Sequence, residues 1–221
     1  MKNLVLIGGG NQAHYTIDII EREGKYNIVG IIDSVHEIGS ERFGYKIIGR
    51  QENLIKLIKE YSIEVGIISI GDNWSRYYVY NKIIKQISNF TFVNAIHPSV
   101  IIGNNVKLGV GIIAMAGCIF NPKSEIGDFT FFATGAQVEH DCVISDFASI
   151  SAGSVTGGYV KLGKYSALTL GVTVLDRIEI GENTVVGAGS LVIKSLPDNV
   201  LVYGNPAKII RNRITGEKFL K

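Results

Sequence analysis

A histidine with acidic neighbours is the group in this sequence best suited to chemistry near neutral pH. His140 lies between Glu139 and Asp141 in the segment 137–142. An imidazole accepts a proton near neutrality, and a neighbouring carboxylate can orient the ring and stabilise its protonated form. These residue types suit a general base, although the spacing alone favours an exposed histidine in a charged patch.

A glycine-rich loop over residues 8–13 is the second candidate. It follows an apolar run and fits the pattern G-x-G-x-x-A, with Asp33 twenty residues after Ala13. This pattern suggests a dinucleotide site. However, the segment is about half the needed size, the rest of the chain offers no redox chemistry, and Asp33 could merely end a strand. A loop whose N–H groups hold phosphate is the smaller inference, and a plain strand-to-helix turn is the alternative.

The elements that carry this loop alternate between strands and helices, which predicts a parallel sheet. Apolar runs predict the strands, and helical spacing of apolar residues predicts the helices. The expected strands cover 4–7, 27–32, 65–70 and 90–95, and the expected helices cover 12–22, 54–58 and 79–87.

The second half of the chain is a repeat. Residues 95–196 divide into 17 consecutive hexads without an insertion, and the second position is apolar in all of them except one, which has Thr156. An aliphatic-Gly pair recurs every 18 residues, with Ser145 as the exception. Period six grouped by three predicts a triangular coil with one short strand on each face, stacked on the next coil.

Composition limits the class of protein. The chain has 221 residues, 46% of them hydrophobic, and a net charge of +2. These values argue against a disordered chain and give no sign of a nucleic-acid surface, and no apolar run reaches the length of a membrane span. We expect a cytoplasmic protein, a short solvated basic tail, no metal site, and inert, inward-facing Cys118 and Cys142 at sixth positions.

The hexads resemble the hexapeptide-repeat family, whose fold is a left-handed parallel β-helix and whose usual activity is acyl transfer from a CoA thioester. The segments 138–144 and 151–153, the connection 96–99 and the closing segment 204–208 resemble a narrower family, the sialic acid O-acetyltransferase-like sugar acetyltransferases. That resemblance extends over nearly the full length. It implies that His140 is the catalytic base and that Asp141 supports it.

The resemblance implies an α/β nucleotide-sugar-binding domain over 1–95, a β-helix acetyltransferase domain over 96–205 and a tail over 206–221. The implied reaction is N-acetylation by acetyl-CoA of a nucleotide-linked 4-amino-4,6-dideoxy-sugar, for surface polysaccharide biosynthesis. Acetylation of a sugar hydroxyl, as on sialic acid, and a non-catalytic nucleotide-sensing scaffold are the alternatives. The family forms homotrimers with active sites between subunits, and Phe129, Phe131 and Phe147 would be costly on an unpaired outer face.

The resemblance also assigns binding residues. The acceptor is expected at Gly9, Gly10, Asn11, Gln12, Asp33, Gly71, Asn73 and Arg76. Acetyl-CoA is expected at Gly158, Thr169 and Ala188.

The glycine pair 157–158 lies one coil after His140. The N–H of Gly158 is implied to contact the thioester oxygen, and a glycine pair that merely eases a corner is the alternative.

The chain departs from the family at three places. Asn11-Gln12 replaces a common Gly-His pair, Ala148 replaces a second histidine, and Thr169 replaces a glycine. Ala148 is the one feature that favours a scaffold. These departures leave His140 in place and put the donor contacts and the sugar preference in question.

Overall fold

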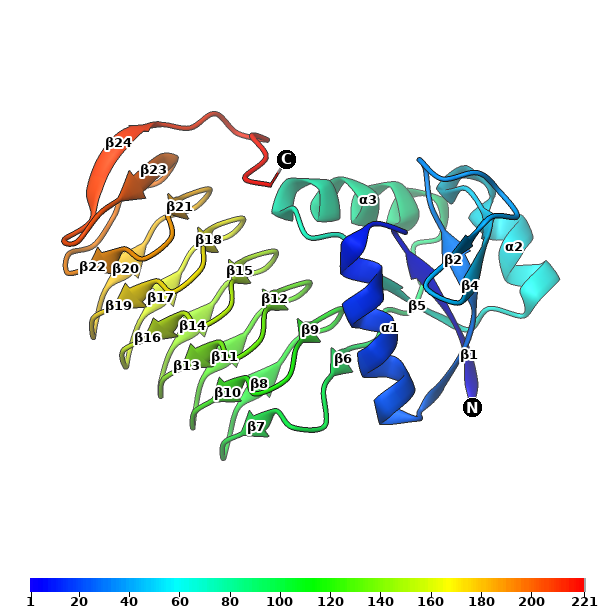
Figure 1. Cartoon of the computed structure of the whole chain (residues 1–221), viewed down its shortest axis with the longest axis horizontal. Coiled ribbons are helices and arrows are strands. Elements are labelled where there is room, and N and C mark those ends of the chain that lie inside the picture. The colour runs from blue at the N-terminus through cyan, green and yellow to red at the C-terminus, as the bar shows by residue number, and fades with distance from the viewer. Residues whose placement is uncertain (221) are drawn as a thin grey trace. The chain divides into compact units, whose positions relative to one another are not determined.

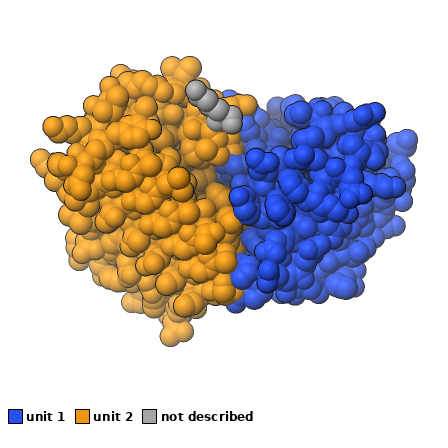
Figure 2. Space-filling model, in the orientation of Figure 1, with its two compact units in different colours: residues 1–71, 75–98 blue, residues 72–74, 99–221 orange. Residues whose placement is uncertain are grey.

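The structure is a computed structural model that describes residues 1–220 in two compact units (Figures 1 and 2). Unit 1 comprises residues 1–71 and 75–98, and unit 2 comprises residues 72–74 and 99 onward. The expected division into an acceptor-binding and an acetyltransferase domain stays a prediction, because compactness tests neither binding nor catalysis.

Unit 1 is a small α/β domain built on a five-stranded sheet in the order β3-β4-β2-β1-β5. Neighbouring strands are parallel except for the antiparallel hairpin β3–β4. The strands are β1 (Lys2–Ile7), β2 (Tyr26–Ile32), β3 (Glu41–Arg42), β4 (Tyr45–Gly49) and β5 (Val65–Ile68). The helices are α1 (Asn11–Glu23), the short 3-10 helix η1 (Gln51–Asn53), α2 (Leu54–Tyr61) and α3 (Asn73–Gln86), of which Asn73 and Trp74 belong to unit 2.

The predicted parallel sheet is confirmed, with two differences. The hairpin β3–β4 was not predicted: β3 has only two residues, too few to show a periodicity, and the five residues of β4 were not recognised as a strand. The strand expected over 90–95 is wrong: the chain there makes a single bridge between Phe92 and Gly66, followed by β6 (Ala95–Ile96). The central β1 follows from its sequence, since Leu4 to Ile7 are all fully buried, as a strand paired on both sides requires.

Unit 2 is the predicted left-handed parallel β-helix, seen as stacked rows of short strands in Figure 1. The first face contains β7 (Ile101–Ile102), β10 (Ile119–Phe120), β13 (Gln137–Val138), β16 (Val155–Thr156), β19 (Thr173–Val174) and β22 (Leu191–Val192). The second face contains β8 (Lys107–Leu108), β11 (Glu125–Ile126), β14 (Val143–Ile144), β17 (Lys161–Leu162) and β20 (Glu179–Ile180). The third face contains β9 (Ile113–Ala114), β12 (Phe131–Phe132), β15 (Ser149–Ile150), β18 (Ala167–Leu168) and β21 (Val185–Val186).

The hexad positions determine what lies inside the coil. Every second-position side chain from Ala114 to Val192 is buried, including the exceptional Thr156, whose hydroxyl accepts a hydrogen bond from the Glu139 N–H at 3.1 Å. Cys118 and Cys142 are fully buried at sixth positions, as expected. Burial raises the pKa of the Cys118 thiol to about 11 and also raises that of Cys142, which disfavours the reactive thiolate.

The C-terminal segment is exposed over Lys208–Asn212, as we expected of a solvated tail, but it forms a strand and is followed by one buried basic residue. Strand β23 (Val200–Tyr203) forms an antiparallel pair with β24 (Lys208–Asn212). Beyond it, the guanidinium of Arg213 is buried and donates to the Asn183 carbonyl at 3.1 Å. Arg211 and Arg213 both pair with Glu217, so this one carboxylate offsets one of the two positive charges.

An aromatic column on one edge of the coil corrects another expectation. Phe129, Phe147 and Tyr165 occupy equivalent corners of successive coils and stack with centroid distances of 5.2 and 5.8 Å. Tyr165 stacks in turn on Trp74, at 4.1 Å. Phe129 and Phe147 are therefore buried within the chain, and their aromatic character does not argue for a subunit interface.

Among residues 1–220, no helix combines the length and the apolar character needed to cross a bilayer.

The stacked core leads to a first prediction. Leu162→Ala removes a fully buried second-position side chain and should lower the free energy of unfolding by about 2–5 kcal/mol, because it leaves a cavity between coils. Leu170→Ala is the matched control, since that side chain is 60% exposed and its loss should change the value by less than about 0.5 kcal/mol. Urea unfolding followed by circular dichroism measures both, and equal shifts would contradict the assigned register.

Candidate active site

His140 lies at a tight corner between two faces of the β-helix. Strand β13 ends at Val138 and β14 begins at Val143, so residues 139–142 turn the chain from the first face to the second. Asp141 has a left-handed backbone with a φ of 57°. The Asp141 N–H donates to the Pro122 carbonyl at 3.1 Å, and the His140 carbonyl accepts from the Tyr159 N–H at 3.0 Å. Coils on both sides therefore hold the backbone of this corner.

Asp141 orients the imidazole of His140. The His140 Nδ1 lies 2.9 Å from the Asp141 Oδ2, and the two side chains are 50% and 29% exposed. A carboxylate only accepts hydrogen bonds, so Nδ1 carries the proton and Nε2 of the neutral ring has a free lone pair. The structure thus brings together the two residues predicted as catalytic and leaves the imidazole ring half-exposed.

Gly158 provides room for that nitrogen. A Cβ atom at Gly158 would lie 2.7 Å from the His140 Nε2 and 2.8 Å from its Cε1. Gly157 has a different reason to be glycine, since its Cβ would lie 2.2 Å from the Asp176 Oδ1 in the next coil. Gly157 therefore allows the coils to stack, and Gly158 allows the histidine ring to sit beside the corner. Neither observation tests the thioester contact expected of the Gly158 N–H.

The Gly158 N–H already has an acceptor in this structure. It donates to the Asp176 Oδ1 at 2.7 Å. The same contact between an N–H and an aspartate of the following coil recurs at Val110, at 2.9 Å, and at Glu182, at 2.7 Å. The thioester contact expected for the Gly158 N–H stays a prediction, and it requires this bond to be shared or replaced.

Tyr159 and Arg177 belong to the same corner and were missed in the sequence. The ring centroids of Tyr159 and His140 are 5.2 Å apart, with an interplanar angle of 87°. The guanidinium of Arg177 lies 4.3 Å from the centroid of the Tyr159 ring. The 18-residue period could have found both residues, because it assigns Asp141, Tyr159 and Arg177 to one position of three successive coils.

The residues expected to bind acetyl-CoA do not all lie on one edge. Thr169 follows β18 and Ala188 follows β21, so both lie where the third face turns into the first. His140 and Gly158 lie where the first face turns into the second. Within a single chain, the whole first face of the β-helix therefore lies between His140 and the edge that carries Thr169 and Ala188.

Ala148 lies in the interior of the coil. It occupies a sixth position and is fully buried. A side chain there faces the packed core, so the residue that replaces a common family histidine is not placed to contact a donor. The buried position of Ala148 therefore does not support the alternative of a non-catalytic scaffold.

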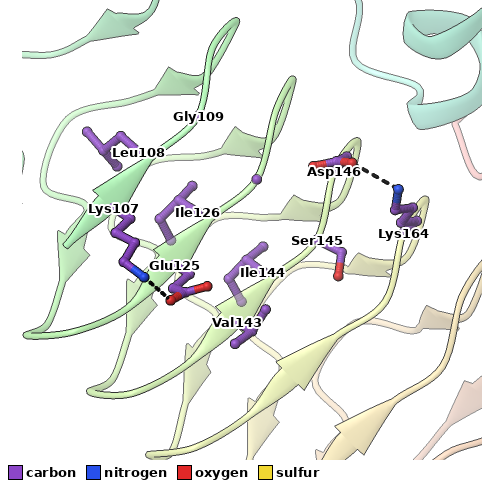
Figure 3. Close-up of a pocket in the computed structure, with 11 residues that line it drawn as sticks. Lys107, Leu108, Gly109, Glu125, Ile126, Val143, Ile144, Ser145, Asp146 and Lys164 are labelled. Carbon is purple, nitrogen blue, oxygen red and sulfur yellow. Dashed lines mark hydrogen bonds and ion pairs between the residues drawn. The ribbon is translucent and has the colours of Figure 1, made fainter.

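The second face carries a shallow hollow of about 350 Å³ (Figure 3). Ion pairs cross it from Lys107 to Glu125 at 2.6 Å and from Lys164 to Asp146 at 3.0 Å. His140 is not among the residues that line it. Within residues 1–220, no three His, Cys, Asp or Glu side chains are grouped to hold a metal ion.

In unit 1, the glycine loop leads into an open helix terminus. Helix α1 begins after Gly10 with no side-chain cap and no acidic residue in its first turn. Gly10 and Asn11 are exposed, while Gly9 is buried. The Gln12 Nε2 is buried without a hydrogen-bond partner among residues 1–220. This arrangement suits an anion, because the first N–H groups of a helix lack intrahelical acceptors.

Asp33 holds the shape of this loop. Its buried carboxylate accepts hydrogen bonds from the N–H groups of Gly9 at 3.2 Å, Val35 at 3.2 Å and His36 at 2.9 Å, and it also contacts the His36 Nδ1. Burial alone would raise the pKa of Asp33, but these hydrogen bonds lower it to about 2. The nucleoside contact expected for Asp33 stays a prediction, since every contact that the structure gives its carboxylate is internal.

Three further expected acceptor residues form part of the packing. Arg76 is buried and donates from Nη1 to the carbonyls of Ile70 at 2.8 Å and Gly71 at 3.0 Å. Asn73 is also fully buried, and its amide donates to the Tyr165 carbonyl at 3.0 Å and accepts from the Ser149 hydroxyl at 2.5 Å. A direct contact of either side chain with a sugar would require this packing to open.

Comparison with known proteins agrees with both units. Residues 3–83 match the family described as the PglD N-terminal domain. The chain is 33% identical to a variant of perosamine N-acetyltransferase from Caulobacter crescentus in complex with CoA and GDP-perosamine, with a TM-score of 0.89 over 96% of this chain and 98% of that one. It is 26% identical to the acetyltransferase domain of PglB from Neisseria gonorrhoeae in complex with acetyl coenzyme A, with a TM-score of 0.85 over 95% and 99% of the two chains.

The curated relatives each match about half of the chain. The chain is 36% identical over 124 residues to the putative colanic acid biosynthesis acetyltransferase WcaF of Escherichia coli, which is 55% of this chain and 68% of that protein. It spans between 29% and 48% of the length of the serine acetyltransferases it matches, for example 32% of serine acetyltransferase 2 of Arabidopsis thaliana. Taken with the full-length structural matches, these similarities show that the chain belongs to the hexapeptide-repeat family of acetyl-CoA-dependent nucleotide-sugar acetyltransferases.

Proposed function

We propose that the protein transfers an acetyl group from acetyl-CoA to the 4-amino group of a nucleotide-linked 4-amino-4,6-dideoxy-sugar, with His140 as the general base. The observation that carries this proposal is the corner itself. Asp141 holds the His140 Nδ1, and Gly158 leaves space beside Nε2, so one basic nitrogen is both oriented and reachable.

The reaction balances with these residues. The amine nitrogen attacks the thioester carbonyl, the new C–N bond forms, and the proton of the amine passes to the His140 Nε2. The C–S bond then breaks, and the proton returns to the leaving sulfur as CoA departs as a thiol. Asp141 stabilises the imidazolium between these steps, because its carboxylate lies 2.9 Å from the Nδ1 proton donor.

The acceptor is assigned to the nucleotide-linked class because of unit 1. Its open α1 terminus behind a glycine loop is suited to a diphosphate, whereas a free sugar would leave these N–H groups without a function. The Caulobacter enzyme, at 33% identity, was crystallised with GDP-perosamine, a nucleotide-linked sugar. A role in surface polysaccharide biosynthesis follows from this substrate class and fits the similarity to WcaF.

A homotrimer would complete the site. Thr169 and Ala188 lie on a different edge of the prism from His140, so donor contacts from these positions can reach His140 only from a neighbouring copy. We therefore propose that acetyl-CoA binds between two subunits. This role for Thr169 and Ala188 comes from the family resemblance, and the separation of the edges supports its assignment to a second subunit.

Acetyl transfer to a panel of acceptors tests the reaction. We expect mass spectrometry to detect acetylation of one 4-amino-sugar linked to GDP, UDP or dTDP, and a fall in kcat of about 10²–10⁴-fold for His140→Ala, which removes the base. Lys82→Ala, a substitution on α3, controls for the effects of mutagenesis and purification and should keep full activity. Transfer to sialic acid and to no amine would favour the O-acetyl alternative, and silence across the panel would sink the proposal.

Gly158→Ala tests the room beside the base. The added Cβ would lie 2.7 Å from Nε2, and the half-exposed ring can swing away from it at little cost in stability. We expect kcat to fall about 10²-fold or more because the displaced ring no longer meets the amine, while the thermal midpoint stays within about 2 °C. Full activity in this variant would show that the space beside Nε2 is not needed.

A further inference from the structure

Tyr159, which neither the residue pattern nor the comparisons assign, contacts the ring of the proposed base. We propose that Tyr159 is a positioning residue for acetyl transfer: it holds the plane of the His140 ring, and Arg177 holds Tyr159 in turn. The inference rests on the proposed role of His140 as base.

The backbone at Tyr159 is the first indication. Tyr159 has a φ of 60°, a left-handed conformation that is unfavourable for a bulky side chain. Corner residues of this coil adopt it because the turn requires it, and Asn105 and Asp141 show the polar residues that tolerate it best. A tyrosine at such a corner requires a favourable contact that offsets the conformational cost of the left-handed backbone.

The second edge of the coil supplies a comparison. Phe129, Phe147 and Tyr165 also have left-handed backbones, but they stack on one another, and both phenylalanines are buried. Packing explains the aromatic residues there. Tyr159 is 42% exposed, so burial does not explain it. Its ring contacts are with His140 on one side and Arg177 on the other.

The contact between Tyr159 and His140 restricts a motion of the imidazole ring that the hydrogen bond to Asp141 leaves free. A single hydrogen bond from Nδ1 to Asp141 fixes one ring atom and leaves rotation of a half-exposed ring about that bond. The Tyr159 ring stands almost perpendicular to the imidazole, at 87° and 5.2 Å, which is an edge-to-face contact. Together the two contacts define both the direction of Nε2 and the plane of its lone pair.

Arg177 completes the column. Its guanidinium lies 4.3 Å from the centroid of Tyr159, within the range of a cation–π contact. Both residues are exposed, so Tyr159 has few other contacts to restrict its χ angles. Three coils thus contribute one layer each: Asp141 with His140, then Tyr159, then Arg177.

The test compares four variants for kcat and for KM of the amino-sugar acceptor. Tyr159→Phe keeps the aromatic ring and should keep kcat within about twofold. Tyr159→Leu should lower kcat about tenfold with little change in KM, because the His140 ring is then less often aligned with the acceptor amine. Arg177→Gln should have a smaller effect of the same kind. Lys123→Leu is the matched control, since it places leucine at the same left-handed corner one coil before Asp141, and it should leave kcat unchanged.

A double variant separates positioning from general disruption. If Tyr159 acts through His140, adding Tyr159→Leu to His140→Ala should cause no further loss of the residual rate. The ring resonances of His140 in NMR spectra should also shift in Tyr159→Leu and not in Lys123→Leu. Unchanged kcat in Tyr159→Leu, or an additive loss in the double variant, would overturn the inference. Retained activity in His140→Ala alone would instead overturn the proposed base.

Discussion

In-register hydrogen bonding between successive coils is the interaction on which the rest of unit 2 depends. Strands pair in parallel with partners 18 residues away, as Ile119 pairs with Gln137 and Gln137 with Val155. This register allows only short corners between the faces, and a left-handed residue recurs in each of them. It also places the equivalent corner residues of successive coils in line with one another. The candidate active site is a direct consequence, because His140 meets Gly158 and Asp141 lies in line with Tyr159.

Stacking and chemistry place different demands on the same corner. Gly157 is required for the close approach of Asp176, and Gly158 is required for the close approach of the His140 ring. The Gly158 N–H is meanwhile bonded to Asp176, as similar N–H groups are in other coils. The corner therefore keeps the backbone bonds of an ordinary repeat and differs from its neighbours in the side chains it carries. A repeat fold can thus carry an oriented histidine at a corner without weakening the register that supports it.

The sequence was sufficient to predict the features that repeat. The six-residue period predicted the burial of the second-position side chains from Ala114 to Val192, whereas Ile102 in the first coil is exposed. Thr156, the polar exception, is accommodated by a hydrogen bond from the Glu139 N–H, which the pattern does not predict. The acidic neighbours of His140 left Asp141 and Glu139 open as its partner, the family resemblance implied Asp141, and the structure shows Asp141 in contact with the ring. What escaped prediction depends on contacts between coils or between distant segments. Phe129 and Phe147 were expected to be costly on an exposed face. The sequence does not show that they stack on each other and, through Tyr165, on Trp74. Asn73 looked available for a substrate because its burial arises from residues more than 70 positions away.

A crystal structure of the protein with CoA and a nucleotide-linked 4-amino-sugar would test most directly whether His140 is the base. The geometry predicts the 4-amino nitrogen within hydrogen-bond distance of the His140 Nε2, with the Nδ1 contact to Asp141 retained and the CoA sulfur close to the same amine. An amine held away from Nε2, with another group in position to take its proton, would contradict this mechanism.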